Sequence, residues 1–185
     1  MVSAQLVSGS SYSSQTSASL AQYAYLYKYD MRNRCIGTKL PGCSWEYKVY
    51  DLADRLIFSQ TGEQRKRGEW QFALPDAMGR ECIMGICKNA IDPFNNPILN
   101  TCVKCERTDN ASLLGYSVTG VALNSVTVLT AKYYAHYLFK MQNGTLISNS
   151  SLNYEANSEL GERYTTSSQG LQTGNATARL DKNGS

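Results

Sequence analysis

Four of the six cysteines fall in one stretch, ECIMGICKNAIDPFNNPILNTCVKCE, which spans residues 81–106. They are Cys82, Cys87, Cys102 and Cys105, with the spacing C-x4-C-x14-C-x2-C. Two close pairs of thiolates can hold one tetrahedral zinc ion with Zn–S distances of about 2.3 Å, so a structural zinc site is one interpretation. The wide spacing of the first pair and the Pro/Asn-rich segment between the pairs count against it.

The other interpretation uses all six cysteines, because Cys35 and Cys43 lie close together in CIGTKLPGC. An even number of cysteines in a loop-rich sequence is typical of a disulfide framework, whose pairing the sequence does not determine. Each bridge would stabilise the fold by about 2–4 kcal/mol. A redox-active pair, Cys102 and Cys105, is a third alternative, but the following ERTDN is a weak helix start. The sequence favours disulfides over zinc, and zinc over redox chemistry.

Four segments match the N-x-[ST] acceptor pattern for N-glycosylation, at Asn110, Asn143, Asn149 and Asn175. A chain rich in Asn, Ser and Thr produces such matches by chance, so the pattern is weak by itself. Asn143 is better explained as a turn residue because Gly144 follows it. The sequons agree with the disulfide interpretation in predicting an exported protein.

Catalytic residues are sparse in this sequence. His136 is the single histidine, and we expect it to be a packed side chain. The stretch GYSVTG lacks the second glycine of a nucleophile elbow. Two carboxylate pairs, Asp51 with Asp54 and Glu69 with Asp76, would act as acid and base only if the fold brought each pair together. We therefore expect no enzyme and no cofactor.

Tyrosine is the other conspicuous residue, with thirteen in the chain. The stretch YAYLYKY alternates, and as a strand it places Tyr23, Tyr25, Tyr27 and Tyr29 on one face. Tyrosine gives a large contact area and tolerates partial hydration, which suits an interaction surface. A half-buried sheet face and a helix over residues 20–30 are the alternatives.

The elements that would position these residues have mostly the period of a β-strand. WEYKVY, RLIFSQ, EWQFAL, YSVTGVAL and SVTVLTAKYYAHYLF are predicted strands, although residues 45–58 also fit a helix. Asn143-Gly144 predicts a two-residue hairpin turn. The sequence shows no repeat with a period of 20–50 residues. We expect a mainly β fold, a sandwich or barrel of short antiparallel strands with little helix.

Composition divides the 185 residues into a polar N-terminal arm (1–19), a β-rich cysteine-containing domain (20–164) and a polar C-terminal arm (165–185). Charged residues make up only 18%, against about 25% in an ordinary soluble domain, and Ser, Thr and Asn replace them. The net charge of +3 and the diluted Arg65-Lys66-Arg67 cluster make nucleic acid an unlikely partner. The sequence has no membrane span and does not begin with a signal peptide.

These observations predict a non-enzymatic structural or surface subunit located outside the cell, on the cell surface or in a virion. It would self-associate with other copies through its tyrosine-rich face and polar arms, and a glycan or cell-surface molecule could be a further partner. One alternative is a secreted carbohydrate-binding, ligand-binding or hydrolytic domain. The other is an intracellular interaction module stabilised by zinc.

Overall fold

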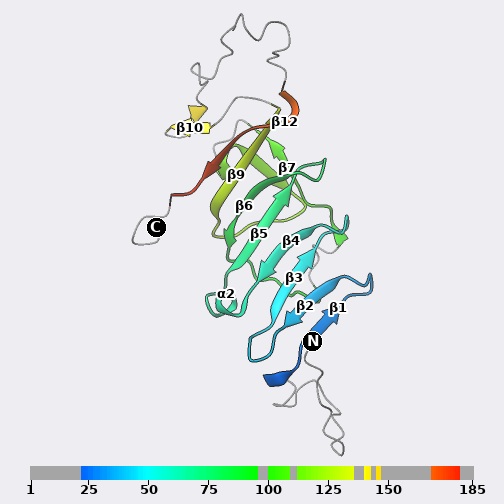
Figure 1. Cartoon of the computed structure of the whole chain (residues 1–185). Helices are drawn as coiled ribbons and strands as arrows, with labels where there is room; N and C mark the ends of the chain where they lie inside the picture. The colour runs from blue at the N-terminus through cyan, green and yellow to red at the C-terminus, as the bar shows by residue number, and fades with distance from the viewer. Residues whose placement is uncertain are drawn as a thin grey trace, which may run out of the picture.

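The computed structural model describes residues 22–95, 100–108, 112–135, 140–142, 145–146 and 168–179. An antiparallel sheet of eight strands dominates this part of the chain, in the order β1-β2-β3-β4-β5-β6-β9-β12 (Figure 1). Its strands are β1 (Leu26–Tyr29), β2 (Cys35–Lys39), β3 (Glu46–Tyr50), β4 (Leu56–Gln60), β5 (Trp70–Pro75), β6 (Glu81–Cys87), β9 (Thr127–Ala135) and β12 (Ser168–Thr177). The prediction of a mainly β, antiparallel fold is confirmed.

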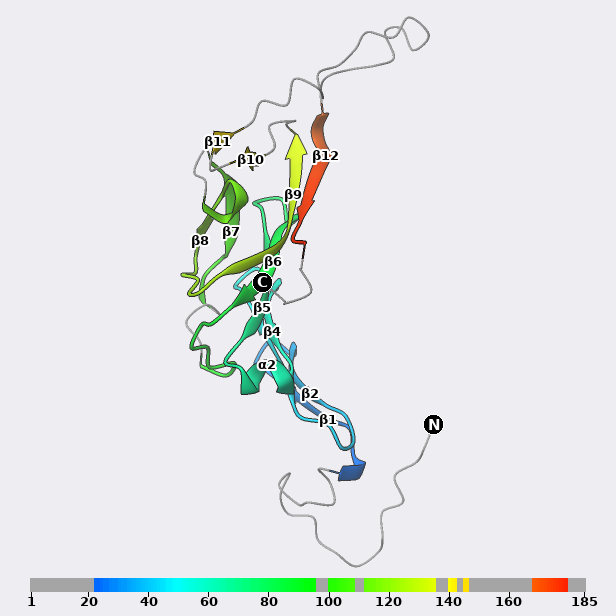
Figure 2. The same ribbon diagram turned by 90° about the vertical axis from the view of Figure 1, so that its left-hand side faces the viewer.

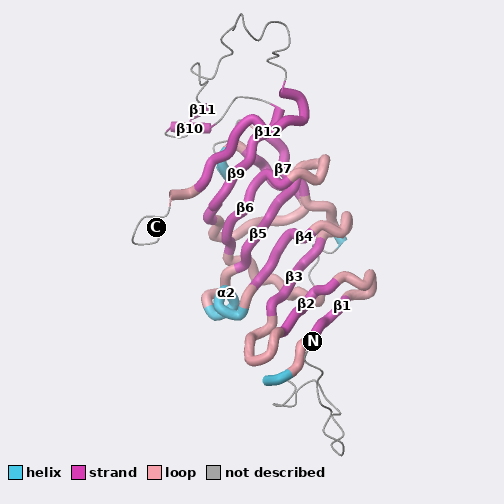
Figure 3. The backbone as a smooth tube through the Cα atoms, in the orientation of Figure 1, coloured by secondary structure: helices cyan, strands magenta, loops and turns pink. Residues whose placement is uncertain are grey.

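The first six strands follow one another in both the chain and the sheet, because short connections join them, one of which contains α2 (Gly62–Lys66) between β4 and β5. Two smaller sheets accompany the large one: β7 (Lys104–Arg107) with β8 (Tyr116–Thr119), and β10 (Lys140–Gln142) with β11 (Thr145–Leu146). In β10–β11, Gln142 pairs with Thr145, and the predicted turn residues Asn143 and Gly144 lie outside the described residues. Helix is scarce among the described residues, where α2 (Gly62–Lys66) and the 3-10 turn η2 (Ser112–Leu114) are short (Figure 3).

The hydrophobic core lies between the large sheet and the β7–β8 hairpin, which covers one of its faces (Figure 2). Side chains of the sheet and of the hairpin segment are buried together in one cluster, which includes Phe72, Leu74, Ile83, Tyr133, Val103, Cys105 and Tyr116. Burying one large apolar side chain contributes about 1.5–3 kcal/mol. The two layers are consistent with the expected sandwich.

Both segments that fitted either a strand or a helix contain strands. Residues 46–50 and 56–60 form β3 and β4, with a turn between them, so a continuous helix over 45–58 is wrong. In the first segment, Leu26–Tyr29 form β1, and burial alternates along it because Tyr27 and Tyr29 are exposed while Leu26 and Lys28 are partly covered. Packing against the neighbouring strand therefore favours the strand period of two over the helix period of 3.6 in this segment.

Part of the expected C-terminal arm is a strand of the sheet. Ser168–Thr177 form β12, which pairs with β9 and places Ala176 opposite Ala131. The N-terminal arm, residues 1–19, lies outside the described residues. Among the helices of the described part, none has the length and apolar character needed to cross a membrane.

Candidate interaction site

Three turns at one end of the large sheet share the pattern Asp-x-x-x-Arg. They span residues 30–34, 51–55 and 76–80 and connect β1 to β2, β3 to β4 and β5 to β6. In each turn one carboxylate oxygen of the aspartate accepts the backbone N–H groups two and four residues later, at 2.8–3.0 Å. The aspartate thereby holds its own turn closed, as its short acceptor side chain allows.

The second carboxylate oxygen of each aspartate pairs with the arginine four residues later. The Nε–Oδ2 distances are 2.6 Å for Arg34–Asp30, 3.0 Å for Arg55–Asp51 and 2.7 Å for Arg80–Asp76. The fourth residue of each turn has positive φ, and it is Asn33, Asp54 or Gly79. Asparagine, aspartate and glycine adopt this conformation most readily, which explains the residue types at that position.

The expectation that the chain contains no repeat is therefore wrong. The three hairpins also share a register shift just after the turn, and the residues at that point are buried: Ile36, Ile57 and Cys82. Only Asp and Arg recur unchanged, so overall similarity between the segments is low. The signal that would have found the repeat is Asp-x-x-[Asn/Asp/Gly]-Arg at residues 30, 51 and 76.

Each arginine also reaches another element at this end of the sheet. Arg34 Nη1 donates to the carbonyl oxygen of Asp51 at 2.9 Å, and Arg55 Nη1 donates to that of Asp76 at 3.2 Å. Arg80 Nη1 donates to the carbonyl oxygen of Gly170 in β12, also at 3.2 Å. We call Arg34, Arg55 and Arg80 the arginine ladder, because together they tie successive hairpins into one sheet end.

A tyrosine lies beneath the first arginine of the ladder. The guanidinium carbon of Arg34 is 5.1 Å from the centre of the Tyr50 ring, which lies directly before the aspartate of the next turn. The Tyr50 hydroxyl donates to the carbonyl oxygen of Cys35, the residue after Arg34, at 3.2 Å. Ring and hydroxyl thus contact both the arginine and its neighbour, and such cation–π contacts contribute about 0.5–2 kcal/mol.

The last arginine of the ladder repeats this arrangement. The guanidinium carbon of Arg80 is 4.3 Å from the centre of the Tyr134 ring in β9. The Tyr134 hydroxyl donates to the carbonyl oxygen of Glu81, the residue after Arg80, at 3.0 Å. For the middle arginine, Arg55, the residue before the aspartate of the next turn is a proline, Pro75, and not a tyrosine.

The middle turn also fastens the β7–β8 cover to the sheet. Asp51 is fully buried, and its Oδ2 accepts the Val103 N–H at 3.2 Å. Arg55 Nη2 donates to the Val103 carbonyl oxygen at 2.6 Å, and the Leu52 N–H donates to the Thr101 carbonyl oxygen at 2.8 Å. Burial raises the pKa of Asp51, but the hydrogen bonds from Arg55 and Val103 outweigh it and hold that pKa below its ordinary value.

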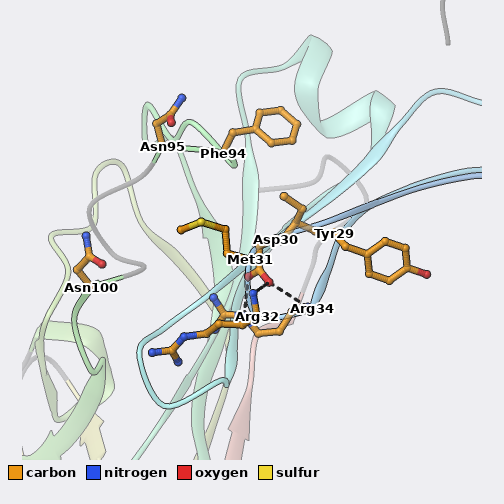
Figure 4. Close-up of a pocket in the computed structure, with 9 residues that line it drawn as sticks. Tyr29, Asp30, Met31, Arg32, Arg34, Phe94, Asn95 and Asn100 are labelled. Carbon is orange, nitrogen blue, oxygen red and sulfur yellow. Dashed lines mark hydrogen bonds and ion pairs between the residues drawn. The ribbon is translucent and has the colours of Figure 1, made fainter. Parts of the chain in front are cut away.

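At the first turn the electrostatics are similar, but the surroundings are open. Burial again raises the pKa of Asp30, and the backbone and side-chain hydrogen bonds from Arg34 outweigh it, so the pKa lies below its ordinary value. Beside this turn lies an open depression of about 580 Å³ (Figure 4). Its lining residues are Tyr29, Asp30, Met31, Arg32, Arg34, Ile36, Phe94, Asn95 and Asn100. Asp30 is its one carboxylate, so it lacks the carboxylate pair that the hydrolytic alternative requires.

The tyrosine face predicted from YAYLYKY is present in part: Tyr27 and Tyr29 lie in the edge strand β1, whereas Tyr25 precedes the strand and Tyr23 has helical backbone. Tyr23, Tyr25, Tyr27 and Tyr29 have exposed fractions of 73, 63, 51 and 60%. The opposite face of β1 is occupied, because Lys28 Nζ lies 4.7 Å from the Trp45 ring centre and 4.8 Å from that of Phe94. The four tyrosines are therefore available for contact.

The backbone of β1 is also open on its outer side. The Asp30 N–H donates inward, to the Arg34 carbonyl oxygen. Because antiparallel residues direct their backbone groups alternately to the two sides, Lys28 also faces β2, while Tyr27 and Tyr29 direct their N–H and C=O groups outward. Among the described strands β1 has one neighbour, β2, so this edge can add a strand.

The six cysteines are separate thiols in the structure. Cys82, Cys87 and Cys105 are buried, Cys35 is partly buried, and Cys43 and Cys102 are exposed. Burial raises the thiol pKa of Cys82 and Cys87 to about 11, and burial together with the nearby Cys82 raises that of Cys105 to about 12. Disulfide formation stays a prediction of the sequence. In the structure the buried cysteines act as small apolar core residues.

Within the described ranges no group of three or more His, Cys, Asp or Glu side chains is arranged to hold a metal. The alternative zinc ligands Cys82, Cys87, Cys102 and Cys105 are thus not gathered into one site. Of the predicted carboxylate pairs, Asp51 and Asp54 lie in the same turn, but Asp51 binds Arg55 whereas Asp54 binds Arg32 and Arg34. In the other pair, Glu69 binds Arg67 and Asp76 binds Arg80.

One of the four sequons lies in the described residues. Asn175 is exposed on the edge strand β12, and its Nδ2 donates to Thr177 Oγ1 at 3.4 Å. Asn110, Asn143, Asn149 and His136 lie outside the described residues. Glycosylation therefore stays a prediction.

No protein-family model matches this chain, and no curated protein and no solved structure matches it significantly. The function is therefore inferred from the geometry of the chain itself.

Proposed function

We propose that this protein is a non-enzymatic structural subunit that assembles by pairing its β1 edge with a strand of another chain. The observation that carries the proposal is the coincidence, among the described residues, of a strand edge without a neighbour and exposed tyrosines, Tyr27 and Tyr29 in β1 and Tyr23 and Tyr25 directly before it. Strand addition provides main-chain hydrogen bonds, and alternate side chains provide specificity. The expected partner is a second copy of the chain, and glycans or cell-surface molecules are further candidates.

The position of β1 supports this proposal. Edge strands are usually protected from pairing by charge, proline or covering segments. On the exposed face of β1 the side chains are uncharged tyrosines, and its single lysine, Lys28, is directed onto Trp45 and Phe94 instead. A surface with hydroxyl and amide groups in place of charges supports a location outside the cell, on the cell surface or in a virion.

Sedimentation velocity of the chain tests the proposal. The double substitution Tyr25→Ser with Tyr27→Ser removes two aromatic contacts from the edge without touching the core, so the assembled species should become smaller. The exposed Tyr23, changed to Ser alone, is the matched control with a smaller expected effect. An unchanged sedimentation profile for the double variant would contradict assembly through β1.

A further inference from the structure

In the first of the three turns, the backbone carbonyl of the aspartate accepts no arginine of the described residues, unlike the same carbonyl in the other two turns. Asp51 and Asp76 each accept two donors at the backbone carbonyl: a turn N–H, from Asp54 or Gly79, and an arginine of the preceding hairpin. The Asp30 carbonyl accepts the Asn33 N–H, and within the described residues no arginine donates to it. A carbonyl oxygen has two lone pairs, so one more donor can bind there.

Tyr29 likewise lacks, among the described residues, the arginine contact that its counterpart Tyr50 has. Like Tyr50, it directly precedes the aspartate of a turn. Tyr50 is partly buried beneath Arg34 and donates from its hydroxyl, whereas Tyr29 is 60% exposed and its ring has no cation over it among the described residues. In Figure 4 the Tyr29 side chain points away from the Asp30–Arg34 pair.

We infer that the β1 edge binds a β-hairpin of a partner chain whose turn carries the Asp-x-x-x-Arg pattern. The incoming strand pairs with β1, and its arginine lies on the Tyr29 ring and donates to the Asp30 carbonyl. The Tyr29 hydroxyl donates to the carbonyl of the residue after that arginine, as the Tyr50 hydroxyl does with Cys35. The inference rests on the proposed function only in taking β1 as the interacting edge.

The segment directly before β1 does not supply the guanidinium. Residues 1–21 contain neither arginine nor lysine. In a second copy, Arg179 follows the β12 edge strand near Thr177. This is the opposite end of β12 from Ser168, which pairs with Ala135 at the end of β9 nearest the repeated turns. Arginine, with its planar guanidinium, is the residue that combines stacking on a ring with a directed hydrogen bond. The occupant is therefore a separate hairpin with an arginine in its turn.

Binding of a synthetic hairpin to the full-length chain tests this inference. The probe is the β3–β4 peptide EYKVYDLADRLIFSQ, residues 46–60, which carries its own Asp-x-x-x-Arg turn and no cysteine. The matched peptide has Arg55→Gln. We expect the natural peptide to bind at least about tenfold more tightly by calorimetry, because the variant loses both the ring contact and a charge-assisted hydrogen bond. In the full-length chain, Tyr29→Leu should abolish the difference between the peptides, whereas Tyr23→Leu should preserve it.

The outcomes separate this inference from the proposed function. Equal binding of both peptides, or no binding by a chain that self-associates through β1, would overturn the arginine site and leave edge assembly intact. Arginine-dependent binding by a chain that stays monomeric would support the site and contradict self-assembly. Persistence of the arginine dependence in Tyr29→Leu would also overturn the inference, because the guanidinium would then bind elsewhere.

Discussion

Asp51 and Arg55 form the best-enclosed ion pair of the repeated turns, with Arg55 Nη2 2.6 Å from an Asp51 carboxylate oxygen. The Asp51 side chain is fully buried, and the same carboxylate accepts the backbone N–H groups of Ala53, Arg55 and Val103. One side chain therefore closes a turn, orients an arginine of the ladder and attaches the cover to the sheet.

Removing the charge of Asp51 should be costly for stability. Asp51→Asn places an amide among donors and leaves Arg55 without its carboxylate, and breaking a buried pair from one side costs about 3–5 kcal/mol. We expect a loss of about 3 kcal/mol in the free energy of unfolding, measured by urea denaturation. Asp54→Asn is the matched control, since Asp54 is 59% exposed and its pairs with Arg32 and Arg34 should contribute less than about 1 kcal/mol. Equal effects of the two substitutions would contradict the central role of Asp51.

Stability should fall in acid through the same carboxylates. The pKa of Asp51 and that of Asp30 both lie below the ordinary value in the fold. As the pH is lowered, these aspartates therefore bind protons in the unfolded chain before they do so in the folded chain, at a pH near the unfolded aspartate pKa of about 3.9. The stabilisation that the two carboxylates give to the fold is complete above that pH. The contribution of these two groups to the free energy of unfolding should be constant between about pH 5 and 7 and should decline below about pH 4. In Asp51→Asn the decline should be shallower, and an equally steep decline would exclude Asp51 as a cause.

Thiol reactivity should follow burial. With a pKa of about 11, the Cys82 and Cys87 thiols are ionised in only about one molecule in a thousand at pH 8, and Cys105, at about 12, in fewer. The exposed Cys43 and Cys102 should react promptly with a thiol reagent, and the three buried cysteines only after denaturation. If no cysteine reacts until a reductant is added, the disulfide framework predicted from the sequence is present instead.

A proline in β1 should prevent assembly without unfolding the sheet. The Tyr27 N–H points outward, so Tyr27→Pro removes a donor that the β1–β2 pairing does not use. We expect the variant to sediment as a monomer, with a free energy of unfolding within about 1 kcal/mol of the natural chain. Tyr27→Phe retains both the ring and the N–H and should assemble normally. Assembly by the proline variant would place the interface elsewhere.

The fold class could be predicted because local patterns and tertiary packing agree. Tyr27 and Tyr29 alternate with Leu26 and Lys28 in both sequence and burial. The turn repeat was missed because it depends on a few polar residues. Asp30, Asp51 and Asp76 are spread among dissimilar neighbours, and their equivalence becomes evident only from shared hydrogen bonds.

The candidate site was only half predictable for a related reason. The exposed tyrosines follow from strand periodicity, but the sequence does not reveal that β1 is an edge strand, since sheet order depends on long-range pairing. The disulfide framework stays a prediction, and the structure offers a second reason for one of its cysteines. Cys82 occupies the position that Ile36 and Ile57 hold in the other hairpins, so its burial alone explains the residue. A pattern of thiols cannot distinguish core packing from cross-linking.

Amide hydrogen exchange of β1, followed residue by residue at low and high protein concentration, tests the central claim most directly. If β1 pairs with another chain, the outward amides of Tyr27 and Tyr29 should become protected as concentration rises, while the Lys28 amide, which faces β2, is protected throughout. Unprotected Tyr27 and Tyr29 amides at every concentration, with Lys28 still protected, would show that the edge stays unpaired and would contradict assembly through β1.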